Sequence, residues 1–320
     1  SYGIAESFNL IAPRLFGGSN NEAVGKDSNM YEFMISQGVP EDQATDFVSG
    51  MPTYWGDQPI VAAPAYIGVV VFFLAIMALF IDKRKIKYVF LSGAAVALVL
   101  SWGKNFPLVT DFFIDFVPMY NKFRAVSSIQ VILELCFPVL AIMGLQSFFT
   151  LDKKLQWKAL YETTIIVILF LCKGMFSFSG GSDAYFQENY GPEFVNALKQ
   201  DRMSLYSSDF LLFIFFIIVV SGVLWLSMKE KVAQNTAIIS VGLLMVSDLF
   251  FVDKNYVSAK DFVRGSQVEA PFQETPSDAE ILKDTSHYRV FEVSGNLSSA
   301  RASYFHKSIG GYSAVKPRRM

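Results

Sequence analysis

The 320-residue chain is 52% hydrophobic and 15% aromatic, and its formal net charge is −2. So much apolar side chain is unusual for a soluble domain of this length and indicates a membrane protein. The near-neutral charge offers no basic excess for a phosphate backbone, so we predict no nucleic-acid partner. Cys136 and Cys172 both fall inside apolar runs, which predicts neither a disulfide framework nor a metal site.

Residues 1–61 contain two short helical patterns. In "SNMYEFMISQG", Ser28 is a suitable N-cap and Gly38 a suitable end, and "PEDQATDFVSG" repeats the plan from Pro40 to Gly50. We therefore expect an ordered segment with short interfacial helices rather than a linker.

Six apolar runs follow, and each is considered as a membrane span because a helix needs about 20 residues to cross about 30 Å of hydrocarbon. The second and sixth runs are the shortest, and the small residues of the second favour close helix packing. The sequence thus predicts an all-α polytopic bundle over residues 62–253. The runs cover residues 62–81, 88–102, 129–149, 159–178, 208–227 and 236–252.

Short basic loops set the expected orientation. Lys and Arg concentrate in cytoplasmic loops, and six spans place all three basic loops on one side, so we predict that both chain ends lie outside. The basic loops are residues 82–87, 152–158 and 229–231. The extracytoplasmic parts are then residues 1–61, 103–128, 179–207 and everything after 253.

Two outer segments are amphipathic. In "PLVTDFFIDFVPMY", Phe112, Phe113 and Phe116 share one helical arc, and Asp111 and Asp115 share the opposite one. This pattern is typical of a helix lying along the outer membrane interface. "GPEFVNALKQ", residues 191–200, has the same character and predicts a second interfacial helix.

The composition changes after residue 253. Thr275 is a suitable N-cap with Pro276 at the first helical position, and residues 288–293 favour a strand. Residues 254–320 are therefore expected to begin an extracytoplasmic α/β region that the sequence truncates.

Three long phrases resemble the YfhO family of bacterial polytopic membrane proteins: "YWGDQPIVAAPAYIGVVVFFLAIMALF", "SWGKNFPLVTDFFIDFVPMYNKFRAVSSIQVILEL" and "SYFHKSIGGYSAVKPRR". The resemblance implies a GT-C-type glycosyltransferase, in which a many-helix bundle carries an outer-face active site. It also implies a polyprenyl-phosphate sugar as the donor and a cell-envelope polymer as the acceptor. The expected location is the bacterial cytoplasmic membrane.

The resemblance also implies that the catalytic acid is missing. GT-C enzymes carry it on the first extracytoplasmic loop, and this chain starts at Ser1 without a Met, as a piece cut from a longer protein does. The catalytic residues are accordingly unknown and expected outside the chain.

Lys104, Lys122 and Arg124 are the donor-phosphate candidates, because they lie on the predicted outer face against the usual charge bias. Arg meets phosphate oxygens bidentately, and a cation there stabilises a phosphate leaving group. The alternatives are contact with ordinary lipid headgroups or pairing with Asp111 and Asp115.

Five further residues are candidates with an open role. Glu134 lies within the third run, where a carboxylate is expected to face the bundle interior, a wet cavity or a partner such as Lys173, or to be protonated. Trp55 and Asp57 precede the first run. Trp55 is either a membrane-interface anchor or a surface for stacking on a sugar, with Asp57 or Gln58 hydrogen-bonding the sugar hydroxyls. Asp248, in the sixth run, is expected to reach water.

The sequence thus favours a membrane glycosyltransferase that uses a lipid-linked sugar, with membrane lipids, the donor and an envelope acceptor as partners. A transporter or lipid flippase and a non-catalytic scaffold for envelope assembly are the alternatives. No cofactor is identified, no metal-ligand spacing is present, and the sequence leaves metal dependence open.

Overall fold

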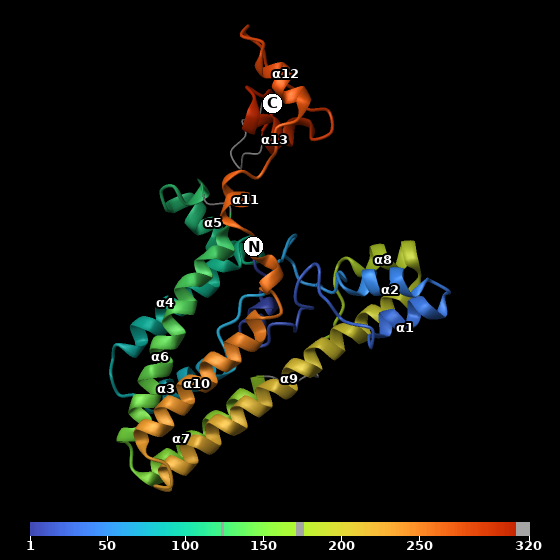
Figure 1. Cartoon of the computed structure of the whole chain (residues 1–320). Coiled ribbons are helices and arrows are strands. Elements are labelled where there is room, and N and C mark those ends of the chain that lie inside the picture. The colour runs from blue at the N-terminus through green and yellow to red at the C-terminus, as the bar shows by residue number, and fades with distance from the viewer. Residues whose placement is uncertain (123–124, 171–175, 312–320) are drawn as a thin grey trace. The chain divides into compact units, whose positions relative to one another are not determined.

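The computed structural model describes residues 1–122, 125–170 and 176–311. It is 65% helical, and no strand forms among these residues, which confirms the all-helical class for them. The chain divides into two compact units, Ser1–Tyr256 and Val257–Met320 (Figure 1). The first unit contains all of the apolar helices.

Six helices correspond to the six apolar runs. Three of them, within the part of the chain that is described, are long and apolar enough to cross a membrane: α9, α10, and α6 together with the turn before it. The structure therefore supports three candidate spans and not six. The helices are α3 (Val69–Ile81), α4 (Lys87–Ser101), α6 (Gln130–Thr150), α7 (Lys153–Phe170), α9 (Pro192–Met228) and α10 (Gln234–Asp253).

The other three helices fall short for two physical reasons. With 13 and 15 residues, α3 and α4 extend only about 20 and 22 Å at 1.5 Å per residue, against about 30 Å of hydrocarbon. Helix α7 has 18 residues, but its first ten residues include four charged ones: Lys153, Lys154, Lys158 and Glu162.

Two helix boundaries differ clearly from the prediction. The first run was expected to be helical from residue 62, but α3 starts at Val69, because Gly68 has φ +89° and residues 62–67 are not helical. Residues 191–200 were expected to form a separate helix. They are instead the first turns of the 37-residue α9, since no Gly or Pro interrupts the chain between Pro192 and Met228 except Gly222 within the apolar part.

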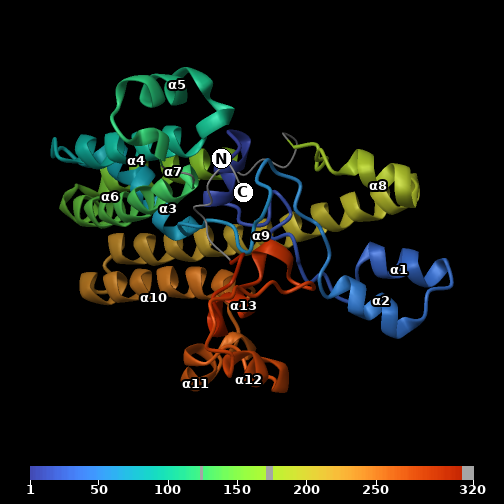
Figure 2. The same cartoon turned by 90° about the horizontal axis from the view of Figure 1, so that it is seen from above.

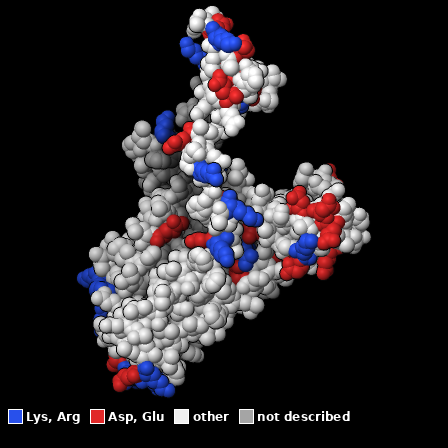
Figure 3. All heavy atoms as spheres, in the orientation of Figure 1, with Lys and Arg blue, Asp and Glu red and all other residues white. Residues whose placement is uncertain are grey.

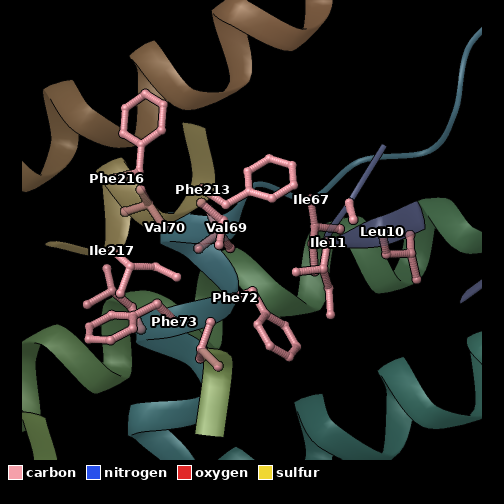
Figure 4. Packing of buried hydrophobic residues seen from close by; sticks show 14 of the residues in the cluster. Leu10, Ile11, Ile67, Val69, Val70, Phe72, Phe73, Phe213, Phe216 and Ile217 are labelled. Atoms are coloured by element: carbon pink, nitrogen blue, oxygen red, sulfur yellow. The ribbon is translucent and has the colours of Figure 1, made fainter. Parts of the chain in front are cut away.

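The main core is built around α3. Its side chains pack against α6, α7 and α9. Leu10, at the end of the 3-10 turn Ala5–Leu10, and the non-helical residues Ile11 and Ile67 close the same cluster (Figure 4). The backbone N–H of Ile67 donates to the carbonyl of Leu10 at 3.0 Å, which ties the segment before α3 to the end of this turn. The non-helical backbone beside α3 is thus enclosed by protein. In an apolar environment this is required, because backbone N–H and C=O groups outside a helix cannot bond to water there.

Contacts bring the three basic loops to one end of this unit. Lys153 after α6 pairs with Glu230 after α9. Ser147 near the end of α6 donates to Asp82 at the end of α3 at 2.7 Å. In Figure 3, charged side chains gather at this end, next to a broad uncharged face. Figure 2 shows that α9 and α10 run side by side.

The predicted short helices near the N-terminus are confirmed as α1 (Asn29–Ser36) and α2 (Glu41–Val48). The Ser28 side chain accepts from the Tyr31 backbone N–H at 3.2 Å, and Gly38 follows with φ +80°. Together with α8 (Asp183–Tyr190), α1 packs against the first turns of α9. These turns of α9 therefore carry the outer segments.

Helix α5 (Pro107–Phe116) confirms the helix that was predicted after the second apolar run. None of its residues is buried, and Leu108, Phe112 and Phe116 are 78%, 55% and 72% exposed. An exposed aromatic face of this kind is what an interfacial helix needs.

The second unit contains the short helices α11 (Gly265–Glu269), α12 (Pro276–Leu282) and α13 (Ala300–Phe305). Thr275 caps α12 as predicted and forms a capping box with Asp278. The predicted strand at 288–293 is wrong: its only ladder contact among the described residues is a single bridge between Val290 and Ser308. One bridge leaves the other backbone groups of that segment without a partner strand.

Candidate functional site

An apolar groove of about 320 Å³ opens between the N-terminal turn Ala5–Leu10 (η1) and three of the helices. Apart from Ser7, every lining residue is apolar, and the two alanines of α4 leave the space open. The lining residues are Ser7, Phe8, Leu10 and Ile11 from the N-terminal segment, Ile67, Phe72 and Ile76 before and in α3, Leu91, Ala94, Ala95 and Leu98 of α4, and Leu133 and Phe137 of α6.

Polar contacts fasten the N-terminal segment to the end of α4 beside this groove. The indole N–H of Trp102 donates to Ser7 Oγ at 2.8 Å, and the backbone N–H of Tyr2 donates to the carbonyl of Ser101 at 3.0 Å. Asn105 Nδ2 donates to the carbonyl of Tyr2 at 2.8 Å. One end of the groove therefore meets a polar junction that carries the predicted site residue Lys104.

The structure describes two of the three donor-phosphate candidates, Lys104 and Lys122. Lys104 and Lys122 are exposed, and neither forms an ion pair with Asp111 or Asp115 among the described residues. The Lys104 backbone N–H donates to Ser1 Oγ at 3.2 Å, which places this lysine at the polar junction. Arg124 lies outside the described residues, so the grouping of the three cations stays a prediction.

Glu134 contradicts the expectation that it faces the bundle interior. It is exposed on α6, between the exposed Val131 and Leu135, while Leu133 turns inward to the groove. Its proposed partner Lys173 lies outside the described residues. The carboxylate is therefore not in the packed interior, and its contact with a wet cavity or with Lys173 stays a prediction.

Trp55 packs inside the outer segment. Its ring stacks on Phe16 at 4.1 Å between centroids, and its indole N–H donates to the carbonyl of Leu15 at 3.1 Å. Because Phe16 covers one face of the ring, Trp55 acts as a packing residue there, and a sugar has at most the other face. Asp57 is exposed, as a polar site residue requires.

Sequence reasoning missed the buried acid next to the groove, Glu6. It is 1% exposed and accepts from the backbone N–H of Gly3 and from the hydroxyl of Tyr54. Burial and the neighbouring Glu6 carboxylate raise the pKa of Tyr54 well above its usual value, so this phenol stays a donor. A single Glu in "GIAESFNL" has no periodicity, so no sequence pattern marked it.

Other buried charged side chains among the described residues have polar partners, although Nη2 of Arg202 has none. Arg14 Nε donates to Asp209 of α9 at 2.8 Å, and Arg202 of α9 pairs with Asp183 of α8 at 2.8 Å. Asp248 of α10, which was expected to reach water, is wholly buried and accepts from the Tyr66 hydroxyl at 2.7 Å. These groups fasten the outer segments and α3 to α9 and α10.

No group of three His, Cys, Asp or Glu side chains within the described residues has the geometry of a metal site.

Comparison with known proteins identifies no relative: no protein-family model, no curated protein and no solved structure matches the chain. The resemblance to the YfhO family therefore rests on the sequence phrases alone.

Proposed function

We propose that the chain is part of a GT-C-type membrane glycosyltransferase that takes a polyprenyl-phosphate-linked sugar and modifies an extracytoplasmic cell-envelope acceptor. The single observation that carries the proposal is the apolar groove that ends at the polar junction of Tyr2, Trp102 and Lys104.

The groove and the junction supply the two environments that such a donor needs. A hydrocarbon chain is stabilised by removal from water along an apolar wall, and Phe72, Leu98 and Phe137 provide one. The phosphate needs a cation in an interfacial position, and the exposed Lys104 lies three residues beyond the end of α4. In this proposal the lipid lies in the groove and the phosphate meets Lys104.

The number of membrane segments and their orientation are part of the same proposal. Helices α3, α4 and α7 would be additional membrane segments, with the end that carries the basic loops facing the cytoplasm of a bacterium. The groove junction, α5 and the second unit then face outward, where nucleotide sugars are absent and a membrane-anchored donor is needed.

A transporter or lipid flippase is the second candidate, and one observation favours it. Helix α3 begins at Val69 after non-helical backbone, and the buried Asp248 accepts from one of its first N–H groups, that of Val70, through Oδ2 at 3.1 Å. Interrupted helices with buried carboxylates are typical of transport pathways.

A bulky side chain in the groove tests the proposal. In full-length protein we expect Ala95→Trp to reduce photo-crosslinking by a diazirine-bearing polyprenyl phosphate to background, and to abolish sugar transfer from the matching donor. Leu211→Trp is the matched control, because Leu211 is 70% exposed on α9, away from the groove.

Equal crosslinking of the Ala95→Trp variant and the control would remove the groove from the proposal. The flippase would be supported by a different result. In that case the protein transfers no sugar, and Ala95→Trp abolishes both crosslinking and the movement of the lipid between leaflets.

A further inference from the structure

A second groove, of about 350 Å³, lies between α7 and the last turns of α9. Its volume falls in the range of small-molecule sites, about 300 to 1,000 Å³. Three aromatic rings line it, and Gly222 keeps it open on the α9 side, because nothing lies within 4 Å of a Cβ added there. The lining includes Trp157, Tyr161 and Thr164 of α7, and Ser221, Gly222 and Trp225 of α9.

The two hydroxyls in this lining are used within the protein, whereas the polar atoms of the three rings are free. Thr164 Oγ1 donates to the carbonyl of Leu160 at 2.7 Å and lies 3.3 Å from Ser221 Oγ, so the two hydroxyls bond each other. The three rings are exposed, and no hydrogen bond among the described residues uses their N–H or O–H groups. Rings of this kind are typical of the membrane–water interface, where one side meets hydrocarbon and the other meets polar headgroups.

A lysine lies one turn beyond the tryptophan on each helix, at the end that carries the basic loops. Lys154 precedes Trp157 by three residues and Lys229 follows Trp225 by four, so each pair shares a helix face. The ion pair between the first residue of α7 and the loop after α9 brings these two helix ends together. Both lysines are exposed, and neither belongs to an ion pair among the described residues.

We propose that this groove binds one acyl chain of an anionic glycerophospholipid, whose phosphate meets Lys154 and Lys229. Charge complementarity decides the occupant. A membrane helix of a second copy fills an apolar groove equally well, but it brings no anion to the two unpaired lysines. Basic pockets between membrane helices on the side of the basic loops are a known way of binding acidic headgroups. The free N–H and O–H groups of the rings then donate to the phosphate and ester oxygens.

The site is separate from the groove of the proposed sugar donor. That groove is lined by η1, α3, α4 and α6 and ends beside Trp102, whereas this one is lined by α7 and α9 and ends at the basic loops. The proposal needs only that these helices lie in a membrane, and it does not depend on sugar transfer. The bound phospholipid fastens α7 to the candidate span α9.

A photoreactive phospholipid tests the site. Full-length protein is placed in phosphatidylcholine vesicles that contain a minor fraction of phosphatidylglycerol with a diazirine on its acyl chain. We expect the label to concentrate in residues 157–164 and 221–225, and unlabelled phosphatidylglycerol to compete better than phosphatidylcholine. Gly222→Leu should reduce this labelling to that of the surrounding lipid. Gly242→Leu on α10 is the matched control, because its added side chain also meets open space but lines no part of this groove.

The headgroup contact is tested at the surface, where misfolding is not expected. Lys154→Gln and Lys229→Gln should each lower the preference for phosphatidylglycerol over phosphatidylcholine about fivefold. The control is Lys85→Gln, an exposed lysine of another basic loop at the same end. Equal losses in all three variants overturn the proposal, because the preference then comes from the whole basic end. Equal labelling of the Gly222→Leu and Gly242→Leu variants overturns it too, as does a Gly222→Cys variant that forms disulfide dimers while the groove takes no lipid label.

Discussion

The two neighbours of α6 contact it in different ways. On one side α3 comes so close that a Cβ added at Gly144 would overlap the carbonyl of Leu74 and lie 3.0 Å from the backbone N of Ala78. On the other side α4 touches α6 at Gly93, where an added Cβ would lie 3.4 Å from the Cys136 sulfur. Beyond that contact, Ala94 and Ala95 line the open groove.

Small residues therefore have opposite consequences on the two sides of α6. At Gly144 the missing side chain lets two backbones approach and makes a tight, filled contact. At Ala94 and Ala95 the facing surfaces stay apart, and the missing side-chain volume remains as space. The α3–α6 contact therefore holds two helices together, whereas the α4–α6 side leaves the groove in which we propose that the lipid binds.

The largest expected effect comes from Gly144→Leu, which breaks the tight contact. The new side chain meets backbone rather than a movable side chain, so α3 and α6 must separate. We expect destabilisation of about 3 kcal/mol or more, seen as a lower midpoint of thermal unfolding in detergent. Gly242→Ala on α10 is the control: nothing lies within 4 Å of its added Cβ, so its midpoint should stay the same or rise. Equal losses in the two variants would contradict the comparison.

The local parts of this fold were predictable from sequence. The caps at Ser28 and Thr275 are short-range devices, in which a side chain bonds a backbone N–H three residues later, and the sequence shows both partners. The late start of α3 was not predictable. It depends on the pairing of Ile67 with Leu10 and on Asp248 bonding Val70. These partners are far apart in the chain.

The candidate site was less predictable than the fold. Glu134 was expected inside because a buried position is the usual one for an acid in an apolar run, but only packing decides which face of α6 turns inward. Glu6 carried no pattern at all. Its burial arises from Tyr54, 48 residues away, and from glycines at positions 3 and 56 that leave room for its carboxylate.

The second prediction tests the α3–α6 contact through the pH dependence of stability. Hydrogen bonds from Arg84 and Ser147 outweigh the effect of burial and lower the pKa of Asp82. A carboxyl whose pKa is lowered on folding stabilises the protein above its unfolded pKa, about 4, and this stabilisation is lost as the pH falls through the folded pKa.

Asp82→Asn should therefore cost about 1 to 2 kcal/mol near neutral pH, and the loss should shrink below pH 4. Unfolding midpoints measured from pH 7 to pH 3 test this, with Asp152→Asn as a control from the neighbouring loop. A loss that does not change with pH would show that the Asp82 charge does not stabilise this end of α3.

The smallest expected effect is that of Ala94→Leu, because it fills space instead of removing or displacing atoms. Ala94 is buried at 3% exposure but borders a groove of about 320 Å³, so the added methyl groups enter open volume. We expect a change of less than about 1.5 kcal/mol, of either sign, in the free energy of unfolding. The same thermal unfolding assay, run beside Gly144→Leu, measures it. A destabilisation as large as that of Gly144→Leu would show that the α4–α6 side is as tightly filled as the α3–α6 side, and that the groove has no room for a hydrocarbon chain.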